Sequence, residues 1–159
     1  MLNIGLLGAG RIGQVHGATL AQMASARAAA VSDFLPDAAA ALAAKLGATA
    51  MSTDEIIADK SIDAVVIGTP TATHYDIIHE AAAAGKAIFC EKPVDLSTDR
   101  IRECLAIVEK AGVPFMTAFN RRFDSSFAYL QKQITDQVIG NVEIVTILSR
   151  DPAPPPIGY

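Results

Sequence analysis

The sequence has few cysteines, no cluster of basic residues and no long apolar segment. Its two cysteines, Cys90 and Cys104, match neither a metal-binding spacing nor a disulfide framework, so we expect no metal site and a reduced, cytoplasmic setting. The formal net charge of -4 makes nucleic acid a poor partner. The apolar runs are too short and too interrupted to span a bilayer, and the N-terminal segment lacks the features of a secretory signal. We therefore expect neither a membrane nor a nucleic-acid partner.

Apolar residues, by contrast, are abundant enough for a packed domain. Hydrophobic residues make up 51% of the 159 and charged residues 19%, with a mean hydropathy of +0.32. A chain of this composition can bury a core, which argues against disorder, and its length suits about one domain. Much of the apolar share is alanine, which favours helices packed closely on a sheet.

Short apolar segments alternate along the chain with segments of helical periodicity. We expect strands at residues 2–8, 26–34, 48–51, 63–69, 86–93 and 114–124. We expect helices at residues 11–25, 36–47, 52–59, 74–85, 97–112 and 125–140. Continuous apolar strands that alternate with helices are typical of a parallel sheet covered on both faces. The predicted fold class is therefore α/β, a doubly wound and mostly parallel Rossmann sheet.

The first turn carries a glycine-rich motif, GAGRIG at residues 8–13, between a predicted strand and a predicted helix. In this context the motif predicts a dinucleotide site. The first glycine allows a tight turn, the second lets the backbone approach a pyrophosphate, and the third lets helix and strand pack closely. The start of the helix offers free N–H groups to the phosphates. We assign to cofactor binding Gly8, Gly10, Arg11, Ile12 and Gly13.

An acidic residue, Asp33, lies at the end of the second predicted strand, about 20 residues beyond the last glycine of the motif, where such sites bind the ribose. A carboxylate accepts hydrogen bonds from the 2′-OH and repels a 2′-phosphate, which favours NAD over NADP. Phe34 follows it and is a candidate for the wall of the adenine pocket. The alternative is an ordinary tight turn followed by a solvated aspartate.

Three later strand ends carry further polar residues, at the sheet edge where such folds bind ligands. Candidates for cofactor contact are Thr69, Pro70, Thr71 and His74, then Glu91 and Lys92, then Arg121. Lys92 is also a candidate to meet a substrate hydroxyl, and partial burial would lower its pKa. The alternative for each group is a capping, solvated or ion-paired role. We expect His16 and His79 to serve packing or hydrogen bonding only.

The motifs together resemble a known enzyme family. GAGRIGQVH, DAVVIGTPTATH, IFCEKPVDLS, FNRRFD and IGNVEIVTILSRDPAPPP look like the glucose–fructose oxidoreductase, inositol dehydrogenase and rhizopine-catabolism family, and most like its inositol 2-dehydrogenases. The resemblance implies that Lys92 is a catalytic lysine that assists proton movement and contacts substrate. It also implies that Arg121 lies near nicotinamide or substrate and that Asp151 lies in a loop that approaches the substrate. In such motifs the Lys92–Pro93 peptide bond is sometimes cis.

The same resemblance implies that the chain is incomplete. Family members run to about twice this length, and their D-x-x-x-H motif with the catalytic histidine follows the segment that ends here. We therefore expect an NAD-binding domain at 1–121 and the beginning of a substrate and oligomerisation domain at 122–159. That beginning should consist of one helix and one strand at Asn141–Arg150, an exposed edge that would either fold back or pair with another copy of the chain.

The predicted function is the N-terminal part of an NAD-dependent dehydrogenase that oxidises a hydroxyl of a cyclic polyol or sugar, with myo-inositol C2 as the first choice. The 159-residue chain alone should be inactive, and the full-length protein should be a homo-oligomer. Two alternatives stay open. One is a stand-alone dinucleotide-binding module with a sensing role, and the other is a dehydrogenase of the same family that acts on another sugar.

Overall fold

The computed structural model describes residues 1–150 and residue 153. The strands are β1 (Leu2–Leu7), β2 (Ala26–Ser32), β3 (Thr49–Ala50), β4 (Ala64–Ile67), β5 (Ala87–Cys90) and β6 (Phe115–Thr117). The helices are α1 (Arg11–Leu20), α2 (Pro36–Leu46), α3 (Thr53–Ala58), α4 (His74–Ala83), α5 (Thr98–Ala111) and α6 (Ser125–Thr135), with 3-10 helices η1 (Thr71–Thr73) and η2 (Asn120–Phe123). Both the predicted alternation of strands and helices and its order along the chain are confirmed.

The strands form one six-stranded sheet in the order β3-β2-β1-β4-β5-β6, and every pair in it is parallel. The chain leaves β3 at one edge and returns through α3 to β4, on the other side of β1. The strand order therefore reverses between β1 and β4, which is where doubly wound sheets bind their ligands.

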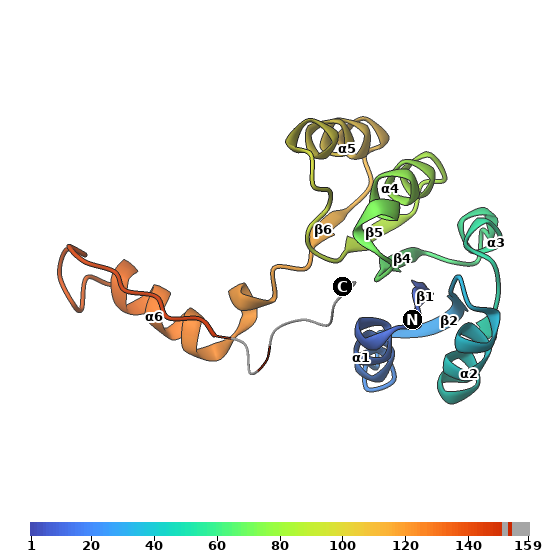
Figure 1. Cartoon of the computed structure of the whole chain (residues 1–159), viewed down its shortest axis with the longest axis horizontal. Helices are drawn as coiled ribbons and strands as arrows, with labels where there is room; N and C mark the ends of the chain where they lie inside the picture. Colours follow the sequence, from blue (N-terminus) through green and yellow to red (C-terminus); the bar gives the residue numbers. More distant parts are fainter. Residues whose placement is uncertain (151–152, 154–159) are drawn as a thin grey trace. The chain divides into compact units, whose positions relative to one another are not determined.

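Side-chain alternation along the strands explains why helices cover both faces. Leu6 packs with Leu42 of α2, whereas its neighbour Leu7 packs in the opposite cluster with Ile78 of α4. Successive side chains of a strand point to opposite faces, so a continuously apolar strand needs cover on both. Figure 1 shows α1 and α2 on one side of the sheet and α4 and α5 on the other.

Local signals in the sequence account for several helix ends. Helix α2 begins at Pro36 and ends before Gly47, as predicted. Helix α3 begins with a capping box, in which the Ser52 hydroxyl accepts a hydrogen bond from the Glu55 N–H and the Glu55 carboxylate accepts one from the Ser52 N–H. Such a cap gives hydrogen-bond acceptors to two backbone N–H groups that the helix itself leaves unpaired.

The chain divides into two compact units, Met1–Phe119 and Asn120–Tyr159. The second unit contains α6, whose first turn is capped by the Asp124 carboxylate. The strand expected at Asn141–Arg150 is wrong, because no strand occurs among the described residues of this unit. A strand persists only where its backbone groups pair with a neighbour, and side chains such as Ile144 and Leu148 are almost fully exposed.

No helix in the part of the chain that the structure describes is long and apolar enough to cross a membrane.

Candidate dinucleotide site

The turn after β1 is built by close backbone packing. Gly8 has φ +101°, and a Cβ there would lie 2.6 Å from the Gly68 carbonyl oxygen. A Cβ on Gly13 would lie 1.9 Å from the Gly8 carbonyl oxygen. Neither position can take a side chain without moving the backbone of the turn. The predicted roles of a tight turn and of close helix–strand packing are therefore supported at Gly8 and Gly13.

Gly10 differs from these two glycines because nothing lies near it. Its backbone is extended, with φ -68° and ψ -167°, and a Cβ there would meet no atom within 4 Å. The packing of the described residues thus gives no reason for a glycine at this position. Open space beside the backbone fits the close approach of a pyrophosphate.

The first turn of α1 presents unpaired N–H groups at the same place. No side chain caps the helix in the described part of the chain, and the first acceptor in the helix, the Gly10 carbonyl, bonds Gln14 N. The free N–H groups and the positive end of the helix dipole suit an anion. Arg11 is exposed beside them, and Ile12 is half-buried with its side chain directed at Gly68.

The carboxylate of Asp33 fastens the turn to the end of β2. Its Oδ2 accepts a hydrogen bond of 2.6 Å from Ala9 N, and its Oδ1 accepts one of 2.9 Å from Leu35 N. Each carboxylate oxygen can accept about two hydrogen bonds, so capacity remains for ribose hydroxyls. Phe34 is 97% exposed, with its ring in solvent. Asp33 therefore has an additional role, in fixing the glycine turn, that sequence reasoning did not identify.

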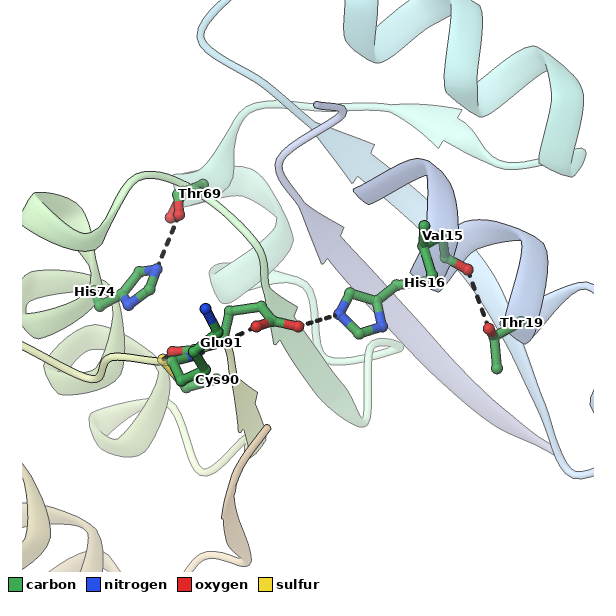
Figure 2. A network of polar contacts seen from close by, with 8 residues as sticks. Val15, His16, Thr19, Thr69, His74, Cys90 and Glu91 are labelled. Carbon is green, nitrogen blue, oxygen red and sulfur yellow. Dashed lines mark hydrogen bonds and ion pairs between the residues drawn. The ribbon is translucent and has the colours of Figure 1, made fainter. Parts of the chain in front are cut away.

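The residues of the loop after β4 differ in how deeply they are buried. Thr69 and Thr71 are half-buried and Pro70 is exposed, and the Thr73 hydroxyl donates to Thr69 Oγ1 over 2.7 Å. The ring of His74 is only 1% exposed. Its Nδ1 lies 2.9 Å from the Pro93 carbonyl oxygen and its Nε2 lies 2.9 Å from the Thr69 carbonyl oxygen. Figure 2 shows this ring directed at Thr69. His74 thus lies between two loops, with both ring nitrogens engaged.

The turn after β5 carries Glu91 and Lys92, and the Lys92–Pro93 peptide bond is cis. Glu91 Oε1 lies 2.8 Å from Nε2 of His16 in α1 (Figure 2). Glu91 Oε2 accepts a hydrogen bond of 3.3 Å from Lys92 N. Lys92 itself is exposed. The partial burial that we considered for it is not seen.

His16 has the packing and hydrogen-bonding role that we expected, and the structure adds its partners. Its ring is edge-on to Phe89, with centroids 5.4 Å apart, and it contacts Glu91 across 75 positions of sequence. The sequence places His16 one turn beyond the last glycine of the motif. The contact joins α1 to the turn that carries Lys92.

The two thiols are poor nucleophiles. Burial raises the pKa of Cys90 to about 12 and that of Cys104 to about 11, so both stay protonated near neutral pH. Within the described residues no group of His, Cys, Asp and Glu side chains could hold a metal ion.

The remaining predicted residues lie in the second unit or beyond the described part. Arg121 belongs to η2, where its guanidinium lies 5.1 Å from the centroid of the Phe127 ring. Asp151 lies outside the described residues. The predicted residues of the first unit, by contrast, all lie at the carboxyl ends of adjacent parallel strands, and several are joined by hydrogen bonds.

Comparison with known proteins decides the family. A family model described as "Oxidoreductase family, NAD-binding Rossmann fold" matches residues 2–119. The chain belongs to this oxidoreductase family. The resemblance seen in the motifs, the Rossmann fold and the predicted cofactor, NAD, agree with this membership.

Relatives with a stated activity include inositol dehydrogenases. The inositol 2-dehydrogenase of Rhizobium meliloti is 52% identical over 99% of this chain and 48% of that protein. The solved structure of a myo-inositol dehydrogenase from Corynebacterium glutamicum is 41% identical, with a TM-score of 0.83 over 90% of this chain and 43% of that one. A scyllo-inositol dehydrogenase from Lactobacillus casei, solved with NAD(H) and scyllo-inositol, is 29% identical, with a TM-score of 0.84 over 89% and 43%. The chain spans about half the length of the curated relatives it matches.

Proposed function

We propose that this chain is the NAD-binding part of a dehydrogenase that oxidises a hydroxyl group of a cyclic polyol, with C2 of myo-inositol as the first candidate. The observation that carries the proposal is the placement of Lys92 at the same sheet edge as the glycine turn and Asp33. The inositol dehydrogenases among the relatives support the choice of substrate. Other sugars remain alternatives within the same family.

The residues of the first unit suit NAD in three ways. The open space at Gly10 and the free N–H groups of α1 suit a pyrophosphate. The Asp33 carboxylate, already oriented by two backbone N–H groups, suits ribose hydroxyls and disfavours a 2′-phosphate. The loop after β4, with Thr69, Pro70 and Thr71, and the Glu91 carboxylate complete the proposed lining within this unit. Arg121 stays a proposed cofactor contact on the motif resemblance alone.

When bound, NAD accepts the hydride that leaves the carbon of the oxidised alcohol. The part that this chain can supply is proton handling at the hydroxyl. Lys92 is exposed at the end of β5, so its side chain can reach a substrate hydroxyl, where its neutral amine form would accept the hydroxyl proton and become the ammonium. We propose Lys92 as the catalytic residue, and Arg121 and Asp151 as further substrate contacts. We also propose that the protein is cytoplasmic and homo-oligomeric, the latter supported by exposed apolar side chains such as Ile144 and Ile147.

The cofactor preference is tested by calorimetric titration of the chain with NAD and with NADP. Asp33→Ser should weaken NAD binding by about ten- to hundredfold, since hydrogen bonds to a charged group are worth about 1.5–3 kcal/mol. The same variant should narrow the preference over NADP. Asp33→Asn, which keeps one acceptor oxygen for Ala9 N but loses the charge, is the matched control for the integrity of the turn. Equal affinity of the unmutated chain for NAD and NADP would reject Asp33 as the selector.

The catalytic role is tested on the protein as its gene encodes it, by NADH formation with myo-inositol. Lys92→Met should lower kcat by about 10²–10⁴-fold, the usual contribution of a positioned acid or base, and leave the Kd of NAD within about threefold. NAD binding without any polyol-dependent NADH formation would instead favour a nucleotide-binding module.

A further inference from the structure

The turn that carries Lys92 is held to the neighbouring loop by a single buried side chain. His74 is the first residue of α4, and its ring is 1% exposed. One ring nitrogen faces the carbonyl oxygen of Pro93, the residue after Lys92, and the other faces the carbonyl oxygen of Thr69. The two carbonyls belong to the loops that follow adjacent strands, β4 and β5.

We propose that His74 is a positioning residue for Lys92, and that its Nδ1–H group holds the turn through the Pro93 carbonyl. This inference rests on the proposed role of Lys92 as the catalytic residue. Both carbonyl oxygens only accept hydrogen bonds and a neutral imidazole carries one N–H, so the ring donates to one of the two carbonyls; we assign that hydrogen to Nδ1, which faces Pro93. The contact lies one residue beyond Lys92, and it acts on backbone rather than on a flexible side chain.

A ring that served only to fill space would not need this geometry. An apolar side chain could occupy the same volume, but the Pro93 carbonyl would then lose its partner and the turn its attachment to α4. The second contact to the turn comes from the other side, where the Glu91 carboxylate meets His16 and Lys92 N. Lys92 is thus the exposed residue of a turn whose neighbours on both sides are anchored.

Two conservative variants separate the two contacts. The amide nitrogen of asparagine comes close to the position of Nδ1, so His74→Asn can keep the bond to Pro93. The longer glutamine places its amide nitrogen near Nε2, on the side of Thr69, so His74→Gln loses the bond to Pro93. His79→Gln makes the same exchange five residues further along α4 and is the matched control.

Amide hydrogen exchange of the chain gives the direct readout. We expect His74→Gln to speed exchange of the amides in residues 91–97 by about tenfold, the equivalent of one hydrogen bond, and His74→Asn to leave both this segment and residues 69–73 within about threefold. His79→Gln should change neither segment. In the assay of NADH formation with myo-inositol, kcat of His74→Gln should be lower than kcat of His74→Asn by at least about tenfold. The reason is that small displacements of a catalytic group have large effects on rate. The KM for NAD should be the same in both variants as in the unmutated protein.

Equal effects of the two His74 variants on exchange in residues 91–97 would overturn the proposal and leave His74 a structural residue. Absence of polyol-dependent activity in the unmutated protein rejects the proposed function instead, while the exchange pattern still decides the contact. A measurement without any variant covers the case in which both fail to fold. Long-range ¹H–¹⁵N spectra of the His74 ring should show a hydrogen on Nδ1, and a ring protonated at Nε2 alone would overturn the proposal.

Discussion

Alanine substitutions in the glycine turn should separate stability from cofactor binding. At Gly13 a new Cβ would lie 1.9 Å from the Gly8 carbonyl oxygen and 2.8 Å from its carbon, both backbone atoms that cannot swing aside. Overpacking typically costs about 1–3 kcal/mol and sometimes more, and the helix propensity of alanine returns about 1 kcal/mol at most. We expect Gly13→Ala to destabilise the first unit by about 3 kcal/mol, which lowers Tm by about 10 °C.

Gly10→Ala should behave in the opposite way. Its Cβ would meet nothing within 4 Å, and its backbone angles are ordinary for alanine. The weaker N-cap and the smaller entropy of the unfolded chain oppose each other, so stability should change by less than about 1 kcal/mol. The methyl group would however occupy the space beside the backbone that we assign to the pyrophosphate. We expect NAD affinity to fall by about tenfold or more.

Thermal melts followed by circular dichroism and calorimetric titration with NAD measure the two effects. Gly17→Ala is the graded control in the same helix, because its Cβ would lie 2.9 Å from Leu46 Cδ1, the end of a side chain that can move. We expect it to cost about 1 kcal/mol. A melting temperature of Gly13→Ala within about 2 °C of the unmutated chain would refute the packing argument. Unchanged NAD affinity of Gly10→Ala would refute the assignment of the open space.

Three further predictions concern single contacts. His16→Ala removes a part-buried hydrogen bond to the Glu91 carboxylate and should lower the free energy of unfolding in urea by about 1–3 kcal/mol. Burial raises the pKa of Cys104 to about 11 and that of Cys90 to about 12, above the ordinary 9.0. The protonated thiols therefore contribute fully to the free energy of unfolding below pH 9, and this contribution is lost as pH rises toward 11 and 12. In urea titrations, Cys104→Ala should show a smaller loss of stability at alkaline pH. Ser52→Ala breaks the capping box of α3 and should cost about 1 kcal/mol by the same assay, whereas an unchanged midpoint would show that the cap is dispensable.

The order of the elements could be predicted because its signals are local. Apolar segments bounded by glycine, Pro36 at one helix start, Ser52 at another, and the spacing within residues 8–13 each act over a few positions. The distance from the glycines to Asp33 is the longest relation that sequence reasoning used, and the structure brings that carboxylate to the turn. The strand at Asn141–Arg150 failed for the converse reason, since its alternation is local but a strand needs a partner.

The sequence by itself determined the α/β alternation, the dinucleotide motif and the residues at the strand ends, because periodicity and turn chemistry depend on near neighbours. Only the tertiary structure decided which of these residues meet. Parallel strands are joined by long crossovers, so His16 meets Glu91 across 75 positions and His74 meets Pro93 across 19. Burial was likewise settled by the fold, which encloses His74 and leaves Lys92 exposed at the end of β5.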